Sequence, residues 1–204
     1  MVTTKTYTFS NVTADHTIAA TFAKDPVTVH VTASISNAVR AGFENKSFTA
    51  RYKINSGSWT TITWNGDNEW ADSGTGGHGF YWNGTPTDVT VAYGDSITLE
   101  IQTVPTGYTY TKTSVISTSH PTPTDYTTTT VTLTNVTETT TMSVNYTGST
   151  YTITTSMTGT GTGSITPAGP VTAYYGEDVT FTVTSDTGCH IQEIAVDGTP
   201  IPLE

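Results

Sequence analysis

Apolar and polar residues alternate along most of the chain in short runs. Residues 27–35, 48–54 and 59–64 alternate in this way, and Gly-, Asn- or Asp-containing turns separate such runs. The runs 48–54 and 59–64 flank residues 55–58 (NSGS) and are predicted to form a hairpin. Alternation with a period of two is typical of β-strands that bury one face. The pattern therefore predicts an all-β protein of antiparallel sheets. Because alternation does not specify strand order, a β-grasp-like and an immunoglobulin-like sandwich topology both remain open.

One alternating segment occurs twice. Residues 7–22 (YTFSNVTADHTIAATF) match residues 131–146 (VTLTNVTETTTMSVNY), and each copy has an Asn-Val-Thr turn between two alternating runs. We interpret each copy as a β-hairpin.

A second segment is also repeated. Residues 89–101 match residues 171–183, and both copies carry a Tyr-Gly-acidic turn between alternating runs, which we interpret as a hairpin. A Gly-containing corner follows each copy, at Gly107-Tyr108 and at Gly188-Cys189. Internal repeats of this kind indicate a tandem array of similar modules.

The order of the repeated segments predicts the domain organisation. We expect residues 1–25 to be the C-terminal part of one repeat, 26–148 a complete module, and 149–202 the N-terminal part of a further repeat. We interpret residues 203–204 as cloning residues and the chain as a piece of a larger protein. A half-module leaves strand edges unpaired, and such edges recruit other strands. Residues 7–22 are therefore expected to complete the half-module 151–201, within one chain or head to tail between chains.

These motifs resemble one family. The Tyr-Gly-acidic turn, the Gly corner, the Val-Asp-Gly turn at 196–198 and the run from Tyr7 to Phe22 are similar to the divergent internalin B-type repeats of bacterial surface proteins. The resemblance is close over 1–25 and 150–202 and loose over 26–147; Cys189 departs from the aromatic usual at its position. It implies small β-grasp-like modules strung along secreted or wall-attached proteins.

Composition excludes several classes of protein. Threonine makes up about a quarter of the 204 residues, which suits half-exposed strands. The formal net charge of −10 disfavours nucleic acid and anionic membrane surfaces as partners. No run of about 18 apolar residues occurs that could span a bilayer. A single cysteine leaves no internal disulfide.

The central module differs from the C-terminal repeat by an insertion, which we place at about residues 37–78. The insertion holds Trp59, Trp64 and Trp70, three of the four tryptophans. Strand parity places Trp59 and Trp64 on opposite faces, so that at most one of them points into the core.

Aromatic and acidic side chains in and beside this insertion suggest a binding surface for a glycan or for a host or cell-surface protein. Aromatic faces stack on sugars, while carboxylates bind hydroxyl groups. The candidates for ligand binding are Trp64, Trp70, Tyr81, Trp82, Asp67 and Glu69. The other interpretation is that the tryptophans close an enlarged core. Asp67, Glu69 and Asp72 could bind calcium, although their spacing does not fit an EF-hand loop. We expect no other cofactor.

Catalysis has little support in the sequence. The five histidines are scattered, and no Gly-x-Ser-x-Gly or phosphate-binding loop occurs. We therefore expect a non-catalytic extracellular repeat segment of a large, adhesin-like bacterial surface protein, located at the cell wall or cell surface. Its expected role is that of a spacer or stalk whose partners are the neighbouring repeats. The alternative is that the central module binds a ligand through the Trp-rich insertion.

Overall fold

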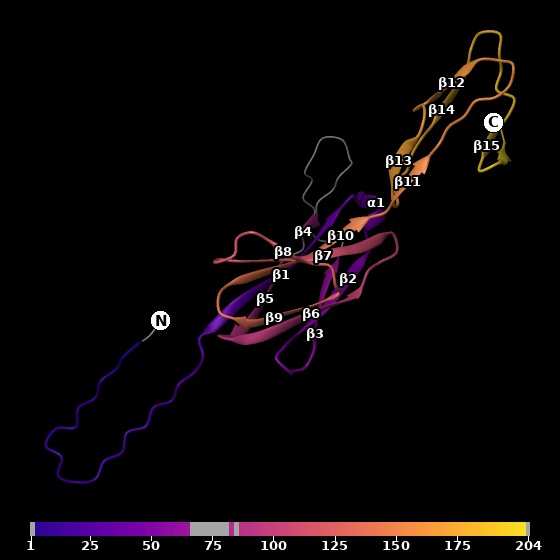
Figure 1. Ribbon diagram of the computed structural model, residues 1–204. Helices are drawn as coiled ribbons and strands as arrows, with labels where there is room; N and C mark the ends of the chain where they lie inside the picture. The colour runs from indigo at the N-terminus through magenta and orange to yellow at the C-terminus, as the bar shows by residue number, and fades with distance from the viewer. Residues whose placement is uncertain (1–2, 66–81, 84–85, 203–204) are drawn as a thin grey trace.

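The computed structural model describes residues 3–65, 82–83 and 86–202; of residues 40, 41, 82 and 83 it describes the backbone only. Residues 26–148 form one module, hereafter the central module (Figure 1). Its elements are β1 (Pro26–Ser36), α1 (Arg40–Phe43), β2 (Ser47–Ile54), β3 (Thr60–Asn65), β4 (Trp82–Asn83), β5 (Thr87–Ala92), β6 (Asp95–Thr103), β7 (Tyr108–Ser117), β8 (Thr124–Tyr126), β9 (Thr130–Val136) and β10 (Thr140–Gly148).

Two sheets face each other in the central module. One has the order β4-β1-β10-β7-β8, with β5 also paired to β1, and the other has the order β3-β2-β6-β9. Among the described strands, all pairs are antiparallel except β1 with β10, which run parallel from Val29–Thr140 to Ser36–Thr147. The prediction of an all-β fold is confirmed. The two sheets share one hydrophobic core, so the architecture of the described module is that of a sandwich.

The core lies between these sheets. Every second residue of β1 and β10 is buried, as expected for strands with one face toward the core. Phe43, Phe48 and Tyr146 are the largest fully buried side chains. The ring centroids of Phe48 and Tyr146 lie 4.7 Å apart, within the range for favourable aromatic contact.

The hairpin predicted around residues 55–58 is confirmed, because β2 and β3 pair antiparallel from Ser47–Asn65 to Tyr52–Thr60. The two other predicted hairpins are wrong in their pairing. β5 and β9 each lie in a different sheet from the strand that follows them. The Tyr-Gly-acidic and Asn-Val-Thr turns are thus corners between the sheets. Alternation shows which face of a strand is buried but not which strand lies beside it.

Residues 149–202, hereafter the C-terminal segment, form six short strands. These are β11 (Thr150–Ile153), β12 (Gly163–Thr166), β13 (Val171–Tyr174), β14 (Thr182–Ser185), β15 (Ile194–Val196) and β16 (Thr199–Ile201). They pair only as β11-β13, β12-β14 and β15-β16. The apolar residues of these strands are mostly half-buried, and Ala173 is the one hydrophobic residue of this segment that is buried.

This pairing repeats that of the central module. Tyr151 pairs with Ala173 and Ile153 with Val171, just as Val27 pairs with Val91 and Val29 with Val89. Among the aligned positions, Gly94 and Gly176 share a positive φ of about 80°, at 82° and 78°. The repeat seen in the sequence is therefore also a repeat in backbone geometry.

The same comparison divides the insertion into two parts. Ile165 of β12 pairs with Val183 of β14, and Ala50 of β2 pairs with Ile101 of β6. Val183 and Ile101 are equivalent in the repeat, so β12 takes the place of β2. The step from Val29 to Ala50 is 21 residues and that from Ile153 to Ile165 is 12, so residues without a counterpart occur already between β1 and β2, and further ones follow β2.

Residues 3–25, hereafter the N-terminal arm, are exposed and form no strand. The two predicted strands of the arm are therefore not formed in the single chain. Asn11 nevertheless has φ 52°, close to the 55° of its counterpart Asn135 at the corner between β9 and β10.

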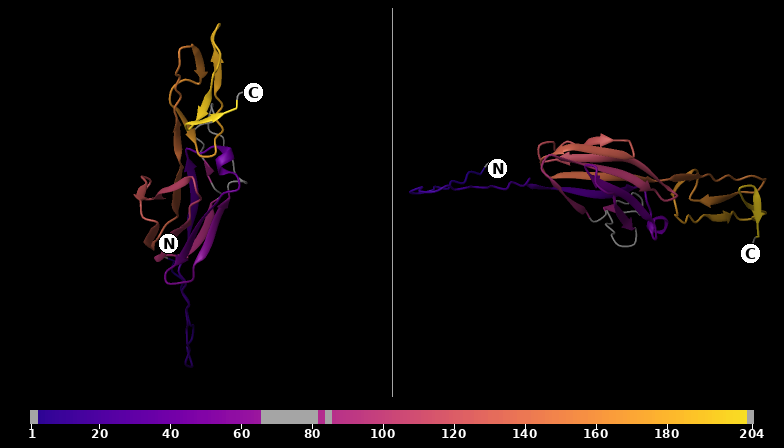
Figure 2. Two further views of the ribbon diagram at one scale, coloured as in Figure 1. Left: turned by 90° about the vertical axis from the view of Figure 1, so that its right-hand side faces the viewer. Right: turned by 90° about the horizontal axis from the view of Figure 1, so that it is seen from below.

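The N-terminal arm and the C-terminal segment leave opposite ends of the central module (Figures 1 and 2). The parallel pairing of β1 with β10 explains this, because the chain enters at the start of β1 and leaves at the end of β10. The arm does not complete the C-terminal segment within this chain, which removes one of the two expected modes of closure.

Candidate functional site

Of the predicted ligand-binding residues, Trp64 is the one whose side chain the structure describes. Trp64 lies in β3 with 3% of its surface exposed and belongs to the core. Its prediction as a sugar-stacking residue is therefore wrong, and the alternative of a core tryptophan holds. Asp67, Glu69, Trp70, Asp72 and Tyr81 lie outside the described residues. Trp82 belongs to β4, opposite Ile35 of β1, and its side chain is not described.

Trp59 lies on the outer face of the four-stranded sheet and is 36% exposed, so the prediction from strand parity is confirmed. The Arg51 guanidinium carbon lies 4.3 Å from a ring centroid of Trp59, and the Lys53 ammonium lies 4.8 Å from it. Arg51 also forms a bidentate ion pair with Glu100 at 2.9–3.2 Å. The Trp59 ring thus makes cation–π contacts with two side chains of β2.

A serine, a histidine and a carboxylate meet at the end of β7, and sequence analysis missed this cluster because Glu138 is remote in the chain. Glu138 accepts hydrogen bonds from the Ser117 hydroxyl at 2.7 Å, the Ser119 amide at 3.0 Å and the Ser119 hydroxyl. The Ser119 Oγ lies 2.8 Å from Nδ1 of His120. These hydrogen bonds from the two serines hold the pKa of Glu138 below its ordinary value.

This cluster does not have the connectivity of a hydrolytic triad. In a triad the histidine lies between the nucleophile and the acid, so that the acid orients the imidazole. Here Ser119 lies between Glu138 and His120, and the carboxylate acts on the serine directly. The arrangement ties the turn after β7 to the corner between β9 and β10, which is a structural role.

The most elaborate contact outside the core is the junction between the central module and the C-terminal segment. The backbone passes from β10 to β11 through Ser149, whose N–H donates to the Gly107 carbonyl at 2.8 Å. Tyr175 donates its N–H to the Ser149 carbonyl at 3.0 Å. The Tyr175 ring packs edge-on against Tyr108, with 5.8 Å between centroids.

Glycines allow the C-terminal segment to approach the central module closely at this junction. A Cβ at Gly107 would lie 2.3 Å from the Tyr175 ring, and one at Gly42 would lie 1.9 Å from the Tyr175 carbonyl oxygen. The Lys46 ammonium lies 5.5 Å from the centroid of the same ring. Tyr175 therefore occupies a space that exists only because residues 42 and 107 are glycines. Its side chain packs against the edge of the central core.

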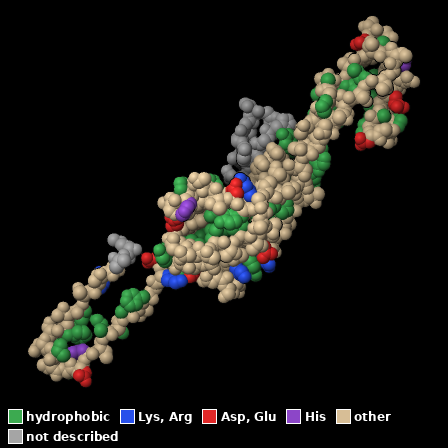
Figure 3. All heavy atoms as spheres, viewed as in Figure 1, with side chains coloured by type: hydrophobic (Ala, Val, Ile, Leu, Met, Phe, Trp, Pro, Cys, Tyr) green, Lys and Arg blue, Asp and Glu red, His purple; other side chains and the backbone are tan. Residues whose placement is uncertain are grey.

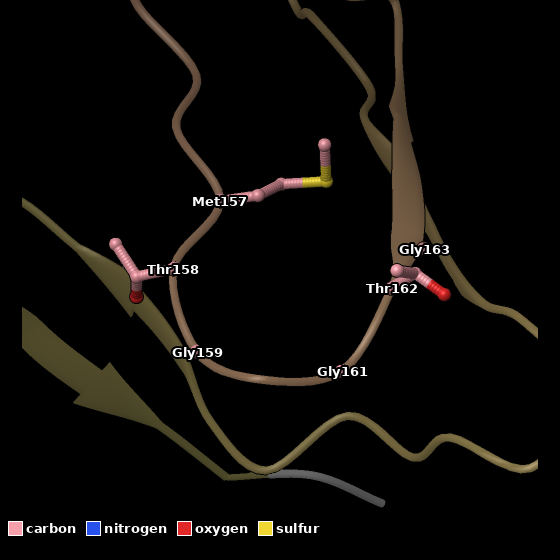
Figure 4. Close-up of a pocket in the computed structure, with 6 residues that line it drawn as sticks. All are labelled: Met157, Thr158, Gly159, Gly161, Thr162 and Gly163. Atoms are coloured by element: carbon pink, nitrogen blue, oxygen red, sulfur yellow. The ribbon is translucent and has the colours of Figure 1, made fainter.

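The Gly-rich turn after β11 encloses a hollow of about 190 Å³. It is lined by Met157, Thr158, Gly159, Gly161, Thr162 and Gly163. In Figure 4 the Met157 side chain extends across the turn toward β12. Met157 is largely exposed, although its equivalent in β1, Ala33, is buried.

The described residues contain neither a candidate metal site nor a candidate membrane-spanning helix. Among the described residues, no three His, Cys, Asp or Glu side chains cluster as metal ligands would. The calcium ligands proposed from the sequence lie outside these residues. Likewise, none of the helical structure described is long and apolar enough to cross a bilayer.

Comparisons with known proteins give no match: no family model, no curated protein and no solved structure is similar to this chain. The resemblance to bacterial surface repeats stays a prediction from the motifs.

Proposed function

We propose that this chain is a non-catalytic spacer segment of an extracellular bacterial surface protein, built from β modules in tandem. The observation that carries the proposal is the junction at Tyr175. Backbone hydrogen bonds and a partly buried aromatic contact connect two successive modules across a single residue, Ser149, between β10 and β11. A short, packed connection keeps successive modules in line, whereas a flexible linker would not.

The composition and shape of the chain support the same proposal. The modules are arranged end to end (Figure 2), so each one adds length. Threonine-rich outer faces of low charge are compatible with a spacer, which needs stable sheets but no reactive groups. The proposed location is the cell surface, and the proposed partners are neighbouring modules of the same protein.

The test is whether the junction is rigid. At low concentration, NMR relaxation should give residues 150–201 the same rotational correlation time as the central module, and small-angle scattering should give an extended particle. Tyr175→Ala removes the ring from its seat, so the C-terminal segment should tumble faster than the central module. Gly42→Ala should act similarly, because the new Cβ would clash with the Tyr175 backbone.

Tyr93→Ala is the matched control. Tyr93 occupies the equivalent turn of the central module but is exposed, so its removal should leave the junction unchanged. Independent tumbling of the C-terminal segment in the unmodified chain would contradict the spacer proposal.

A further inference from the structure

A hollow of about 320 Å³ lies at the edge of the sandwich, where residues of both sheets line it. β7 and β8 of one sheet and β9 of the other form most of its walls, and β8 and β9 are each the end strand of their sheet. Sites for small molecules are concave and measure about 300–1,000 Å³, so the hollow suits a small ligand. In Figure 3, hydrophobic, histidine and acidic side chains gather on one face of the central module.

The floor of the hollow is apolar and held in place. Val115, Tyr126 and Leu133 line it, and all three are partly buried side chains packed against the central core. The Tyr110 hydroxyl lies 3.0 Å from the Tyr126 carbonyl oxygen and 2.9 Å from that of Thr128, so a hydrogen bond from it fixes the backbone at β8. The hollow therefore offers a preformed apolar surface that includes an aromatic ring.

The hydrogen-bonded cluster of Ser117, Ser119, His120 and Glu138 lines the same hollow. The Ser119 hydroxyl has one hydrogen, and it donates this hydrogen to Glu138, because an ionised carboxylate can only accept. The hydrogen bond between Ser119 Oγ and His120 Nδ1, at 2.8 Å, must then be donated by the Nδ1–H. In neutral His120 the other ring nitrogen, Nε2, consequently has the free lone pair and is an acceptor.

Two acceptors of this cluster are left for a ligand. Glu138 Oε1 accepts both serine hydroxyls, and Oε2 accepts the Ser119 amide. A carboxylate has about four acceptor sites, so Oε2 can accept one more hydrogen bond. In the described part of the chain, no donor lies within hydrogen-bond distance of His120 Nε2. Acceptors without donors match a ligand that carries several hydroxyl groups.

The charge of the lining narrows the class of ligand. Neither lysine nor arginine occurs among the described residues that line the hollow. Glu138 is ionised at neutral pH, because hydrogen bonds from Ser119 and Ser117 lower its pKa. An anionic ligand would be repelled. An uncharged ring fits both parts of the site if one face carries CH groups and its edge carries hydroxyls.

We propose that the hollow between β8 and β9 binds one uncharged sugar ring of a glycan. The CH face of the ring packs on Tyr126 and Leu133, and its hydroxyls donate to Glu138 Oε2 and His120 Nε2. The residues that form this site follow β6 in the chain and lie outside the Trp-rich insertion. The site goes beyond the spacer role, and its existence does not depend on whether the junction at Tyr175 is rigid.

A titration followed by two-dimensional NMR of the backbone amides tests the site. The probes are the methyl glycosides of glucose, galactose, mannose and N-acetylglucosamine. At least one of them should shift the amide signals of residues 115–138 in a saturable way, with a Kd on the order of 1 mM, since an open hollow contacts only one ring. The absence of a saturable shift with all of these glycosides would overturn the proposal.

Substitutions in the two parts of the site should weaken binding. His120→Ala removes the Nε2 acceptor, and the Kd should rise about threefold or more. Tyr126→Ala removes the ring from the floor, and the Kd should rise at least about tenfold, whereas Tyr126→Phe keeps the ring and should bind normally. Thermal unfolding shows whether Tyr126→Ala is folded. His120 is exposed, so its substitution tests the site without this risk.

His30→Ala is the matched control. His30 also hydrogen-bonds a carboxylate through Nδ1, that of Asp88, but it does not line the hollow. Its substitution should leave the Kd unchanged, and an equal rise in both histidine variants would overturn the proposal. Cyclohexylammonium is the contrasting probe. If it bound as tightly as the best glycoside, the carboxylate would merely attract cations, and the assignment to a sugar would be wrong.

Discussion

Single residues in the core show where packing was favoured over hydrogen bonding. The indole Nε1 of Trp64 and the hydroxyls of Tyr108 and Tyr146 are buried without a hydrogen-bond partner among the described residues. An unsatisfied buried polar atom costs about 1–3 kcal/mol. The aromatic rings must therefore contribute enough through burial to outweigh this penalty.

Tyr146→Phe should preserve or increase stability. The substitution removes a buried hydroxyl that has no partner, and the repeat itself places Phe22 at the equivalent position. We expect the free energy of unfolding in urea to rise by up to about 1 kcal/mol. Tyr146→Ala is the contrasting variant and should cost about 3–5 kcal/mol through the cavity that it leaves. A clear loss of stability in Tyr146→Phe would mean that the hydroxyl has a partner in solution.

Tyr108 should make the protein sensitive to alkali. Burial raises the pKa of Tyr108 to about 12 from the ordinary 10.0, with a smaller contribution from nearby Tyr175. Between these values the unfolded state loses the proton while the folded state keeps it, so the free energy of unfolding falls as pH rises. Tyr108→Phe should weaken this decline, as measured by urea unfolding at several alkaline pH values. Equal declines in both proteins would contradict the assignment.

At the scale of elements, the sequence predicted which residues face the core better than which strands are neighbours. Trp59 and Trp64 were placed on opposite faces correctly, because side chains alternate strictly along a strand. The sequence predicts a hairpin turn at Asn135, where the structure has a corner between the two sheets. Apolar and polar residues alternate in the same way on either side of a hairpin turn and of a corner between sheets. Only the long-range pairing of β9 with β6 distinguishes the two structures. The Tyr175 junction was missed for the same reason, since its glycine seats lie far away in the chain.

Glu138 should stabilise the turn after β7 in a pH-dependent way. Its pKa is lowered in the folded state by hydrogen bonds from Ser119 and Ser117. A group with a lowered pKa stabilises the fold above its ordinary pKa of 4.5, and the contribution disappears as pH falls through the folded value. Glu138→Gln should therefore lower the melting temperature at neutral pH but not in acid. The exposed Glu193→Gln is a control for loss of charge, and an identical pH profile for the two variants would contradict this role.

At the scale of the whole molecule, the described chain consists of a sandwich with an exposed arm at one end and a segment of paired short strands at the other. The internal repeat indicated that the last segment resembles the central module, and the pairing of β11 with β13 supports this residue by residue. The placement of the parts could not come from the sequence. It follows from the parallel pairing of β1 with β10, which sends the two ends of the chain in opposite directions.

That parallel pair also determines how the module responds to tension. A pull on the two ends draws β1 toward its own start and β10 toward its own end, so the strands slide along each other. The hydrogen bonds between β1 and β10, from Val29–Thr140 to Ser36–Thr147, are then loaded simultaneously in shear. They do not break one after another. The central module should thus resist stretching far better than its modest size suggests, and it should rupture abruptly rather than unravel.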